Sequence, residues 1–301
     1  DMSKGKIWIT AMRPRTLPLA IASIVMGSAL AAVWQPFSWS VAVFSVLTAV
    51  LLQILSNLAN DYGDSQHGAD HAQREGPPRA VQSGAISGKT MLTAMAIMAI
   101  LSVISGLILL WFAFGSEAQD LFLIFVLIGA MAILAAVAYT AGFRPYGYAG
   151  LGDLSVLLFF GWVGVMGTYF LHSHRFDWEI LLPATSSGLL AVAVLNVNNI
   201  RDLESDRLAG KQTIPVRIGL QRARIYHWTL LFAAILAATL YVLLARSSLW
   251  QFLYLLTVPL LFRNGLAVQR TAALRDLNPM LKQLSMATLL FVLLFSLGQL
   301  L

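Results

Sequence analysis

Two clusters of side-chain amides and carboxylates stand where long apolar segments end. The first contains Asn57, Asn60, Asp61 and Asp64, and Asp70 follows shortly after them. If a helix continues from the apolar segment through this cluster, residues three and four positions apart lie on one of its faces. The first four residues would then form a stripe of oxygen-bearing side chains that projects from a helix end.

The second cluster repeats the spacing of the first. It contains Asn198, Asp202 and Asp206 at intervals of four, the interval that also separates Asn60 from Asp64. The Asn–Asp pairs of the two clusters are offset by 138 residues, which is the length of about four membrane spans with their connections. We therefore expect two related four-helix units whose stripes face each other across a bundle.

Facing stripes of this kind are suited to a divalent cation. Carboxylates close together in a low dielectric repel one another unless some are protonated or a cation lies between them. Mg²⁺ takes oxygen ligands and is commonly shared between a few carboxylates and substrate phosphates. The chain has no cysteine, and its five histidines are not paired with the stripes at metal-ligand spacing, which argues against zinc. The predicted Mg²⁺ ligands are Asp61, Asp64, Asp202, Asp206, Asn60 and Asn198.

The long segments after the two stripes contain basic residues that suit a phosphate group. Arg74 and Arg79 follow the first stripe, and Lys211 follows the second. Arg binds phosphate oxygens as a planar fork and Lys acts as a point charge, although a basic residue beside a membrane span can also be a topology anchor. We expect these three residues, together with Asn57, to bind a diphosphate-bearing substrate.

Composition places the stripes in a membrane protein. The chain of 301 residues is 58% hydrophobic and 11% charged, with a mean hydropathy of +0.75, whereas soluble domains carry about 25% charged residues. The two longest connections, 59–90 and 198–224, are expected to cap a single all-α domain, 1–301, with pseudo-repeats at approximately 17–140 and 153–265. Nine segments are apolar over a length that can span a bilayer: 17–34, 40–58, 91–114, 120–140, 153–172, 179–197, 225–245, 248–265 and 283–301.

The distribution of basic residues predicts the orientation in the membrane. With a cytoplasmic N-terminus, every Lys and Arg except Arg175 and Arg246 falls in an inside segment, as the positive-inside rule requires. The pI near 9.8 is then a topology signal, and nucleic acid is not an expected partner. A basic N-terminus before an apolar run also fits a signal peptide, but the remaining chain is equally apolar. We expect a multi-pass protein of the bacterial inner membrane, in contact with lipid and with both stripes on the cytoplasmic side.

These motifs resemble those of the UbiA superfamily of intramembrane aromatic prenyltransferases, and the resemblance covers the whole chain. The first family motif, Asn-Asp-x-x-Asp-x-x-x-Asp, is matched by Asn60, Asp61 and Asp64, while Gly68 replaces the last Asp and Asp70 follows two residues later. The second motif, Asp-x-x-x-Asp, is intact at 202–206. Several segments resemble the branch that acts on 1,4-dihydroxy-2-naphthoate in menaquinone biosynthesis: RPRTLPLA (13–20), LSNLANDYGD (55–64), GPPRAVQSG (76–84), YTAGFRPYGYAGLGD (139–153) and NVNNIRDLESDRLAGKQTIPVRIG (196–219).

The resemblance implies nine helices and a Mg²⁺-dependent reaction of a polyprenyl diphosphate. The head group would bind Mg²⁺ between the stripes, and loss of diphosphate would leave an allylic cation for attack by the aromatic ring. In the naphthoate branch the attacked ring carbon loses its carboxylate as CO₂, and the product is a demethylmenaquinone precursor. The isoprenoid tail would lie in a groove between helices that opens sideways to lipid.

The loop after the fourth span holds four further candidates. Tyr139 and Tyr146 are expected beside the substrates, Arg144 would pair with the naphthoate carboxylate, and Asp153 would orient or deprotonate a ring hydroxyl. The alternatives are a cytoplasmic anchor for Arg144 and a helix N-cap for Asp153. The residue types do not decide between these readings.

Other classes of protein also use membrane carboxylates. An ion-coupled transporter would place them near the midplane on broken helices, whereas here they lie at the ends of spans. A CDP-alcohol phosphatidyltransferase would have Gly after its second Asp, where this chain has Ser65. The nearest alternative is a sister prenyltransferase that acts on 4-hydroxybenzoate, homogentisate or haem.

Overall fold

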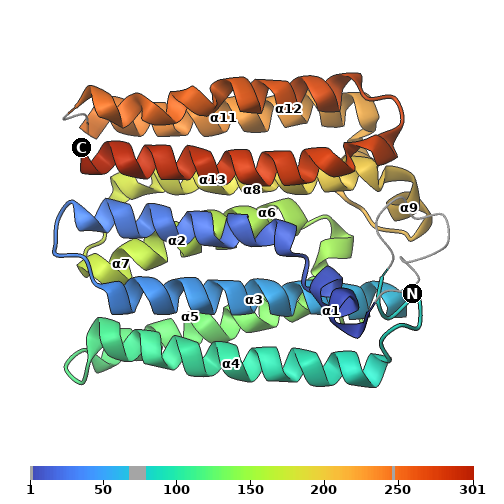
Figure 1. Ribbon diagram of the computed structural model, residues 1–301, viewed down its shortest axis with the longest axis horizontal. Helices are drawn as coiled ribbons and strands as arrows, with labels where there is room; N and C mark the ends of the chain where they lie inside the picture. The colour runs from blue at the N-terminus through green and yellow to red at the C-terminus, as the bar shows by residue number, and fades with distance from the viewer. Residues whose placement is uncertain (1–2, 68–78, 246–247) are drawn as a thin grey trace.

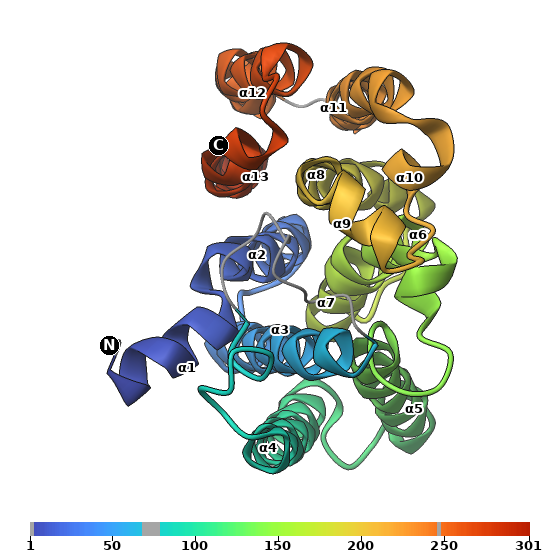
Figure 2. The same cartoon turned by 90° about the vertical axis from the view of Figure 1, so that its right-hand side faces the viewer.

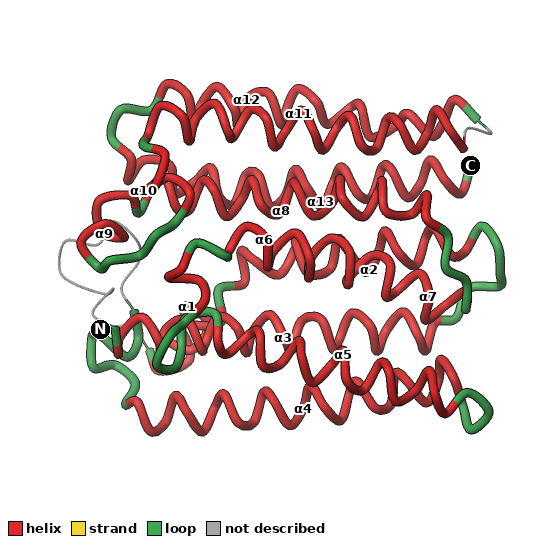
Figure 3. The backbone as a smooth tube through the Cα atoms, turned by 180° about the vertical axis from the view of Figure 1, so that it is seen from behind, coloured by secondary structure: helices red, strands yellow, loops and turns green. Residues whose placement is uncertain are grey.

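The structure is a computed structural model that describes residues 3–67, 79–245 and 248–301, and all regular structure in these ranges is helical (Figures 1 and 3). The all-α prediction is therefore confirmed. The α-helices are α1 (Lys4–Met12), α2 (Leu17–Ala32), α3 (Trp39–Gln66), α4 (Gly88–Phe114), α5 (Gln119–Ala138), α6 (Gly152–Val156), α7 (Gly167–Ser173), α8 (Leu181–Arg201), α9 (Leu203–Leu208), α10 (Ile214–Ile218), α11 (Leu220–Ala245), α12 (Val258–Arg270) and α13 (Asn278–Leu300). The other helical segments are η1 (Pro14–Thr16), η2 (Tyr146–Ala149), the π-helical η3 (Leu157–Met166), η4 (Trp178–Ile180), η5 (Leu249–Thr257) and η6 (Leu274–Leu277).

Within the described ranges, nine helical stretches are long and apolar enough to cross a membrane by their length and composition. Each overlaps one predicted span. The helices are the expected solution in lipid, because a helix pairs its own backbone polar groups. They are Lys4–Ala32, Trp39–Gln66, Gly88–Phe114, Gln119–Ala138, Gly152–Ser173, Trp178–Arg201, Leu220–Ala245, Leu249–Arg270 and Leu274–Leu300.

The spans lie side by side with their axes roughly parallel (Figure 1), and three apolar clusters hold them together, one of which joins α3, α4 and α7. The largest cluster joins α2, η3, α8, α11 and α13, and the remaining one joins α1, α3 and α4. Close approach between η3 and α8 depends on Gly161, where a Cβ atom would lie 2.7 Å from the carbonyl oxygen of Ala184. Small residues at such crossings let helix backbones approach each other in lipid.

A buried polar chain ties the second half of the bundle together. The Nε2 atom of His227 on α11 lies 2.8 Å from Oδ1 of Asn264 on α12, and Asn264 Nδ2 donates to Gln283 Oε1 on α13 at 2.7 Å. His227 and Asn264 are both fully buried. Because unpaired polar groups are costly in an apolar interior, this chain fixes the relative positions of the three helices.

Both stripes lie at the same end of the bundle, which we call the motif end. Figure 2 views the molecule from this end, with α1, α9 and α10 in front. The helix α3 runs unbroken through the first stripe, as expected. The second stripe differs from the expected continuous helix, since α8 ends at Arg201 and α9 begins at Leu203. Asp202 caps α8, and its carbonyl accepts hydrogen bonds from the Asp206 backbone and the Ser205 hydroxyl, which keep Asp202 beside Asp206.

The end of α5 is fixed against the first stripe. Thr140 Oγ1 donates to Asn60 Oδ1 at 2.7 Å and to the Ala59 carbonyl at 3.2 Å. At Gly63 the two segments approach so closely that a Cβ atom would fall inside van der Waals contact with the Thr140 carbonyl. Only glycine therefore allows this approach one residue before Asp64.

Gly63→Ala is expected to lower the free energy of unfolding by about 1–3 kcal/mol, because the added methyl group must push α3 and the Thr140 backbone apart. Thermal unfolding of the purified protein in detergent measures the effect. Gly129→Ala on α5 is the matched control, since a Cβ atom there meets no heavy atom within 4 Å. Equal melting temperatures for the two variants would contradict this account of the helix contact.

Candidate active site

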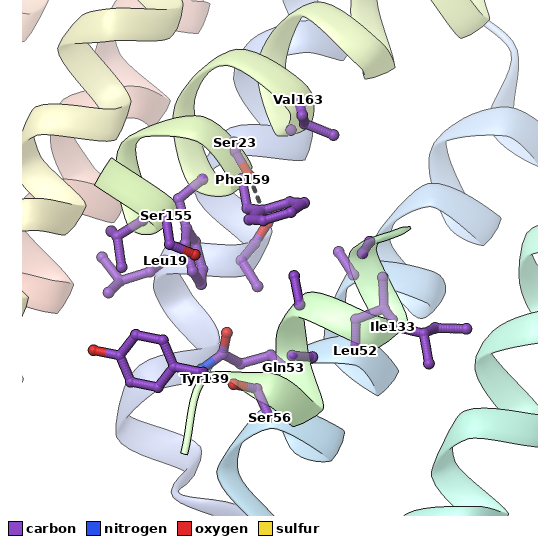
Figure 4. Close-up of a pocket in the computed structure, with 18 of the residues that line it drawn as sticks. Leu19, Ser23, Leu52, Gln53, Ser56, Ile133, Tyr139, Ser155, Phe159 and Val163 are labelled. Carbon is purple, nitrogen blue, oxygen red and sulfur yellow. Dashed lines mark hydrogen bonds between the residues drawn. The ribbon is translucent and has the colours of Figure 1, made fainter. Parts of the chain in front are cut away.

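A cavity of about 1100 Å³ opens among the helices and contains the stripe side chains at the motif end. Away from that end its walls are mainly apolar, and Figure 4 shows Phe159, Val163, Leu52 and Ile133 around it. It therefore joins a charged head region to a long apolar interior. The predicted site residues that line it are Asn57, Asn60, Asp64, Arg79, Tyr139, Tyr146, Asn198, Asp202, Asp206 and Lys211.

Asp64 is the most heavily contacted carboxylate of the first stripe. One oxygen accepts a hydrogen bond from the Tyr148 hydroxyl at 2.7 Å and lies 3.0 Å from Lys211 Nζ, and the other accepts from Arg79 at 3.2 Å. The side chain is 4% exposed. Two cations and a phenol thus compensate a buried negative charge, as burial of a charge requires.

Lys211 links the two stripes. Its ammonium lies 3.0 Å from Asp64 and 3.7 Å from Asp206, so the two carboxylates are no farther apart than the sum of these distances. The ammonium also lies over the ring of Tyr148, 4.7 Å from its centroid. The structure thus brings the stripes together at one point in the cavity, although they are far apart in the sequence.

Arg201 organises the second stripe. Its guanidinium, which is fully buried, donates to both oxygens of Asp202 at 2.7 Å, to Asn198 Oδ1 at 2.8 Å and to Asn278 Oδ1 at 2.9 Å. A bidentate Arg–carboxylate pair is both strong and geometrically specific. Arg201 therefore holds Asp202 and Asn198 in one arrangement at the start of α13.

The amides of the first stripe have separate tasks. Asn57 Nδ2 donates to the Met12 carbonyl at 2.8 Å and to Thr16 Oγ1 at 2.9 Å, and so fixes the chain between α1 and α2. Asn60 accepts from Thr140, as described above. Both amides face the cavity from positions that these hydrogen bonds hold.

Asp61 does not line the main cavity, which contrasts with its predicted role as a metal ligand. Its two oxygens accept hydrogen bonds from the backbone N–H groups of Ala80 and Val81, at 3.0 and 2.9 Å. These N–H groups lie in a turn and need an acceptor when buried. Asp61 thus anchors the segment that contains Arg79, beside a small pocket under α1.

Two more predicted contacts do not reach the cavity. Arg144 is exposed and its guanidinium lies 5.6 Å from the centroid of the Phe143 ring, so the structure does not support its pairing with a bound carboxylate. Asp153 accepts a hydrogen bond from the Tyr226 hydroxyl of α11 at 2.7 Å and is absent from the cavity wall. The predictions for Asp70 and Arg74 fall outside the described residues.

Two tyrosines close the head region on the α5 side. The rings of Tyr139 and Tyr146 meet edge to face at 5.3 Å, and the Tyr146 hydroxyl donates to the Ala135 carbonyl at 2.8 Å. Burial, followed by the nearby Asp153 charge, raises the pKa of Tyr139, and burial raises the pKa of Tyr146. A raised pKa favours the protonated form of a phenol, so both hydroxyls remain neutral hydrogen-bonding groups at neutral pH.

These features match a known family. Residues 20–278 match the UbiA prenyltransferase family. The chain belongs to this family. It is 48% identical to the 1,4-dihydroxy-2-naphthoate octaprenyltransferase of Haemophilus influenzae, over 98% of this chain and 96% of that protein, and 46% identical to the enzyme of that name from Escherichia coli, over 99% and 96%. The fold is similar to that of a UbiA homolog from Archaeoglobus fulgidus bound to GPP and Mg²⁺, with a TM-score of 0.66, 15% identity, and 98% and 100% of the two chains covered.

The predicted UbiA membership is thus confirmed, as is the nine-span fold within the described ranges, and three further residues lie around this site. Tyr148 and Arg201 contact the stripe carboxylates directly, and Arg15, whose guanidinium donates to Asn278 at 3.1 Å, lines the cavity. Each sits inside a segment that carried the family resemblance. The carboxylate of the adjacent Asp202 indicated that Arg201 could belong to the site. The positive-inside pattern explained the charge of Arg201 equally well.

No group of three or more His, Cys, Asp or Glu residues in the described ranges is arranged to hold a metal ion. Asp64, Asp202 and Asp206 are instead near Lys211, Arg79 and Arg201. The donor set of the cavity nevertheless consists of carboxylate and amide oxygens, which are ligands of hard cations such as Mg²⁺. Lys211 and Arg79 belong to flexible side-chain types that can turn toward a diphosphate and release carboxylate oxygens.

The different environments of Asp64 and Asp61 give a direct test. Asp64→Asn is expected to weaken the joint binding of Mg²⁺ and pyrophosphate at least about tenfold, because it removes a charged oxygen ligand from the cavity. Titration calorimetry on the purified protein measures this. Unchanged affinity would exclude Asp64 as a ligand.

Asp61→Asn is expected to act through the backbone of residues 79–86. Loss of one charged acceptor weakens the hydrogen bonds to Ala80 and Val81, so proteolytic cleavage in this segment should accelerate in the apo protein. The cleavage rate of the Glu204→Gln protein serves as the comparison, because Glu204 is exposed and pairs with Arg207 outside this segment. Equal cleavage rates in the two variants would show that Asp61 does not anchor the turn.

Proposed function

We propose that the protein transfers a polyprenyl group from polyprenyl diphosphate to 1,4-dihydroxy-2-naphthoate, with loss of CO₂ and diphosphate, in menaquinone biosynthesis. The observation that carries the proposal is the single cavity that joins two facing carboxylate stripes to an apolar interior. A donor with a charged head and a long apolar tail matches both parts. The names of the relatives that are 48% and 46% identical supply the identity of the aromatic acceptor.

Mg²⁺ would be held by Asp64, Asp202 and Asp206, with Asn60 and Asn198 as neutral oxygen ligands. When bound, the metal neutralises the charge that develops on the leaving diphosphate. The Mg²⁺ bound to the Archaeoglobus fulgidus homolog supports this choice of cation, because that protein has a similar fold. Asp61 is not included, because its carboxylate is occupied by the backbone of Ala80 and Val81.

Lys211, Arg79 and Arg15 would bind the oxygens of the diphosphate. All three line the cavity, and Lys211 already lies between the stripes. Their charge favours departure of the diphosphate with the electron pair of the allylic C–O bond. The ring carbon that bears the carboxylate then forms the new C–C bond, and cleavage of its bond to CO₂ returns an electron pair to the ring.

The acceptor ring would lie between the head region and the apolar interior, beside Tyr139. Tyr139, Gln53 and Ser56, labelled in Figure 4, all line the cavity, and the side chains of Gln53 and Ser56 can hydrogen-bond ring hydroxyls. The raised pKa of Tyr139 keeps its hydroxyl neutral at pH 7. Asp153 does not line the cavity. It would act as a positioning residue, because its charge helps to raise the pKa of Tyr139, which does line the cavity.

The motif end would face the cytoplasm of a bacterial inner membrane. The positive-inside rule supports this orientation, because Arg175 and Arg246 are the two basic residues that the sequence assigns to the opposite side. Arg175 lies in the turn between α7 and η4 and forms an ion pair with Asp177 at 3.1 Å. A soluble aromatic acceptor would then reach the site from the cytoplasm, and the prenyl donor would reach it from the membrane.

The acceptor assignment is tested by supplying the purified protein with Mg²⁺, a polyprenyl diphosphate and one aromatic acid at a time. We expect prenylated product with release of CO₂ from 1,4-dihydroxy-2-naphthoate and none from 4-hydroxybenzoate. Product from 4-hydroxybenzoate alone would reject the naphthoate assignment and retain prenyl transfer. Ion flux in liposomes without any prenyl transfer would support the transporter alternative.

Asp64→Ala and Asp202→Ala are expected to lower kcat by about 10³-fold or more, since each removes a charged group from the site where diphosphate leaves. Membrane insertion should be retained. Glu204→Ala is the control, because Glu204 is in the same motif but is exposed and pairs with Arg207. Near-normal rates in either aspartate variant would contradict the metal assignment.

A further inference from the structure

The apolar part of the cavity follows α5 for most of the length of this helix. Five residues of α5 and its C-cap that line the cavity are spaced three or four apart and therefore share a face: Phe125, Gly129, Ala132, Ala136 and Tyr139. The face has an aromatic side chain at each end and small residues between them. Ile128 and Ile133 of α5 also line the cavity beside this row, so Gly129, Ala132 and Ala136 form a strip of small side chains between bulkier ones.

Aromatic rings lie on the cavity wall toward the end away from the motifs, where Leu121 and Phe176 also line the cavity. Phe125 stacks on Phe170 of α7, with ring centroids 5.7 Å apart and planes 21° apart, and both line the cavity. Phe114 of α4 packs behind them, 5.4 and 6.3 Å from the two rings, and is buried. The turn after α7 is held to α4 by His174 Nε2, which lies 2.7 Å from the Ala113 carbonyl. Three spans therefore support the ring pair.

The length of the path can be compared with an isoprenoid chain. Tyr139 and Phe125 are fourteen helical positions apart, which is about 21 Å along the axis. An extended polypeptide advances about 3.3–3.6 Å for three backbone bonds, so the four chain bonds of an isoprene unit advance about 4.5 Å. Four or five extended units would therefore cover the path.

We propose that the isoprenoid tail of the donor lies along this face of α5, and that the Phe125–Phe170 pair meets the tail at its fourth or fifth isoprene unit. This inference rests on the proposed function, since it takes a polyprenyl diphosphate as the donor. The two phenylalanines are specificity-determining residues for donor length, remote from the reacting carbon. Units beyond the pair turn away from the path and leave past α5, none of whose residues is buried.

Gly129→Leu gives the sharpest test. Gly129 lies one helical turn closer to Tyr139 than Phe125 does, and a side chain there would enter the cavity without meeting protein atoms at its Cβ. The position is about 15 Å from Tyr139 along the helix, beyond the reach of two isoprene units but within that of four. With 1,4-dihydroxy-2-naphthoate as acceptor, KM for geranylgeranyl diphosphate is expected to rise about tenfold or more. KM for geranyl diphosphate and kcat for both donors should remain within about twofold, because the lost interaction is remote from the reaction.

Phe125→Ala tests the end of the path. KM for geranylgeranyl and octaprenyl diphosphate is expected to rise by about tenfold, because the tail loses the apolar contact with one aromatic ring. KM for geranyl diphosphate should stay unchanged, because its shorter tail does not reach the ring. Phe112→Ala is the matched control: Phe112 stacks on Phe44 at 5.6 Å near the same end of α4, but neither ring lines the cavity. This variant should behave like the wild type with all three donors.

Activity with geranyl diphosphate reports whether each variant is folded, so a length-dependent change in KM cannot come from a damaged fold. Equal changes in KM for the two-unit and four-unit donors, or no change with either donor, would overturn the inference. A wild-type protein that transfers no prenyl group from any donor would instead overturn the proposed function, and the inference with it.

Discussion

The ammonium of Lys211 between Asp64 and Asp206 is the interaction on which the rest of the site depends. Carboxylates that are buried close together at helix ends are unfavourable without nearby positive charge. Lys211, Arg79 and Arg201 supply that charge from the protein itself, so the stripes are stable in the absence of substrate. Two of these cations lie in connecting segments outside the helices, where side chains can exchange a carboxylate for a phosphate oxygen.

The helix contacts make this charge arrangement possible. Residues of the two stripes can share Lys211 only if α3 and α8 end at the same level along the bundle axis. The end of α5, which contacts the first stripe, must lie at that level too. Gly63 and Thr140 set the height of α5 against α3, and Arg201 sets the end of α8 against Asn278 at the start of α13. The chain of His227, Asn264 and Gln283 then keeps α11, α12 and α13 in register. Polar contacts at a few points therefore position a site in a bundle whose remaining contacts are mostly nonspecific apolar packing.

Helical periodicity predicted that Asn60 and Asp64 share a face of α3, and both line the cavity with Asn198, Asp202 and Asp206, although α8 ends before Asp202. The anchoring contacts of Asp61 were not predictable, because its partners, Ala80 and Val81, lie in a turn whose path no local pattern specifies. The choice between an anchor and a carboxylate partner for Arg144 stayed open for a related reason, since the direction of the loop after α5 is set by tertiary contacts. The nine spans of the described ranges were predictable from hydropathy because lipid imposes a similar length on all of them, whereas no pattern in the sequence marks the break between α8 and α9 at Asp202.

The helix α5 has the cavity on one side and contacts α3 and α4 on another, yet none of its residues is buried. In most helical bundles, neighbouring side chains would occupy the space that this helix faces. A long-chain donor placed there would supply that missing packing, and any ligand that binds only the native state stabilises it by mass action. The enzyme would then be most compact when loaded and loosest between turnovers, with its lipid substrate serving as a transient part of its own hydrophobic core.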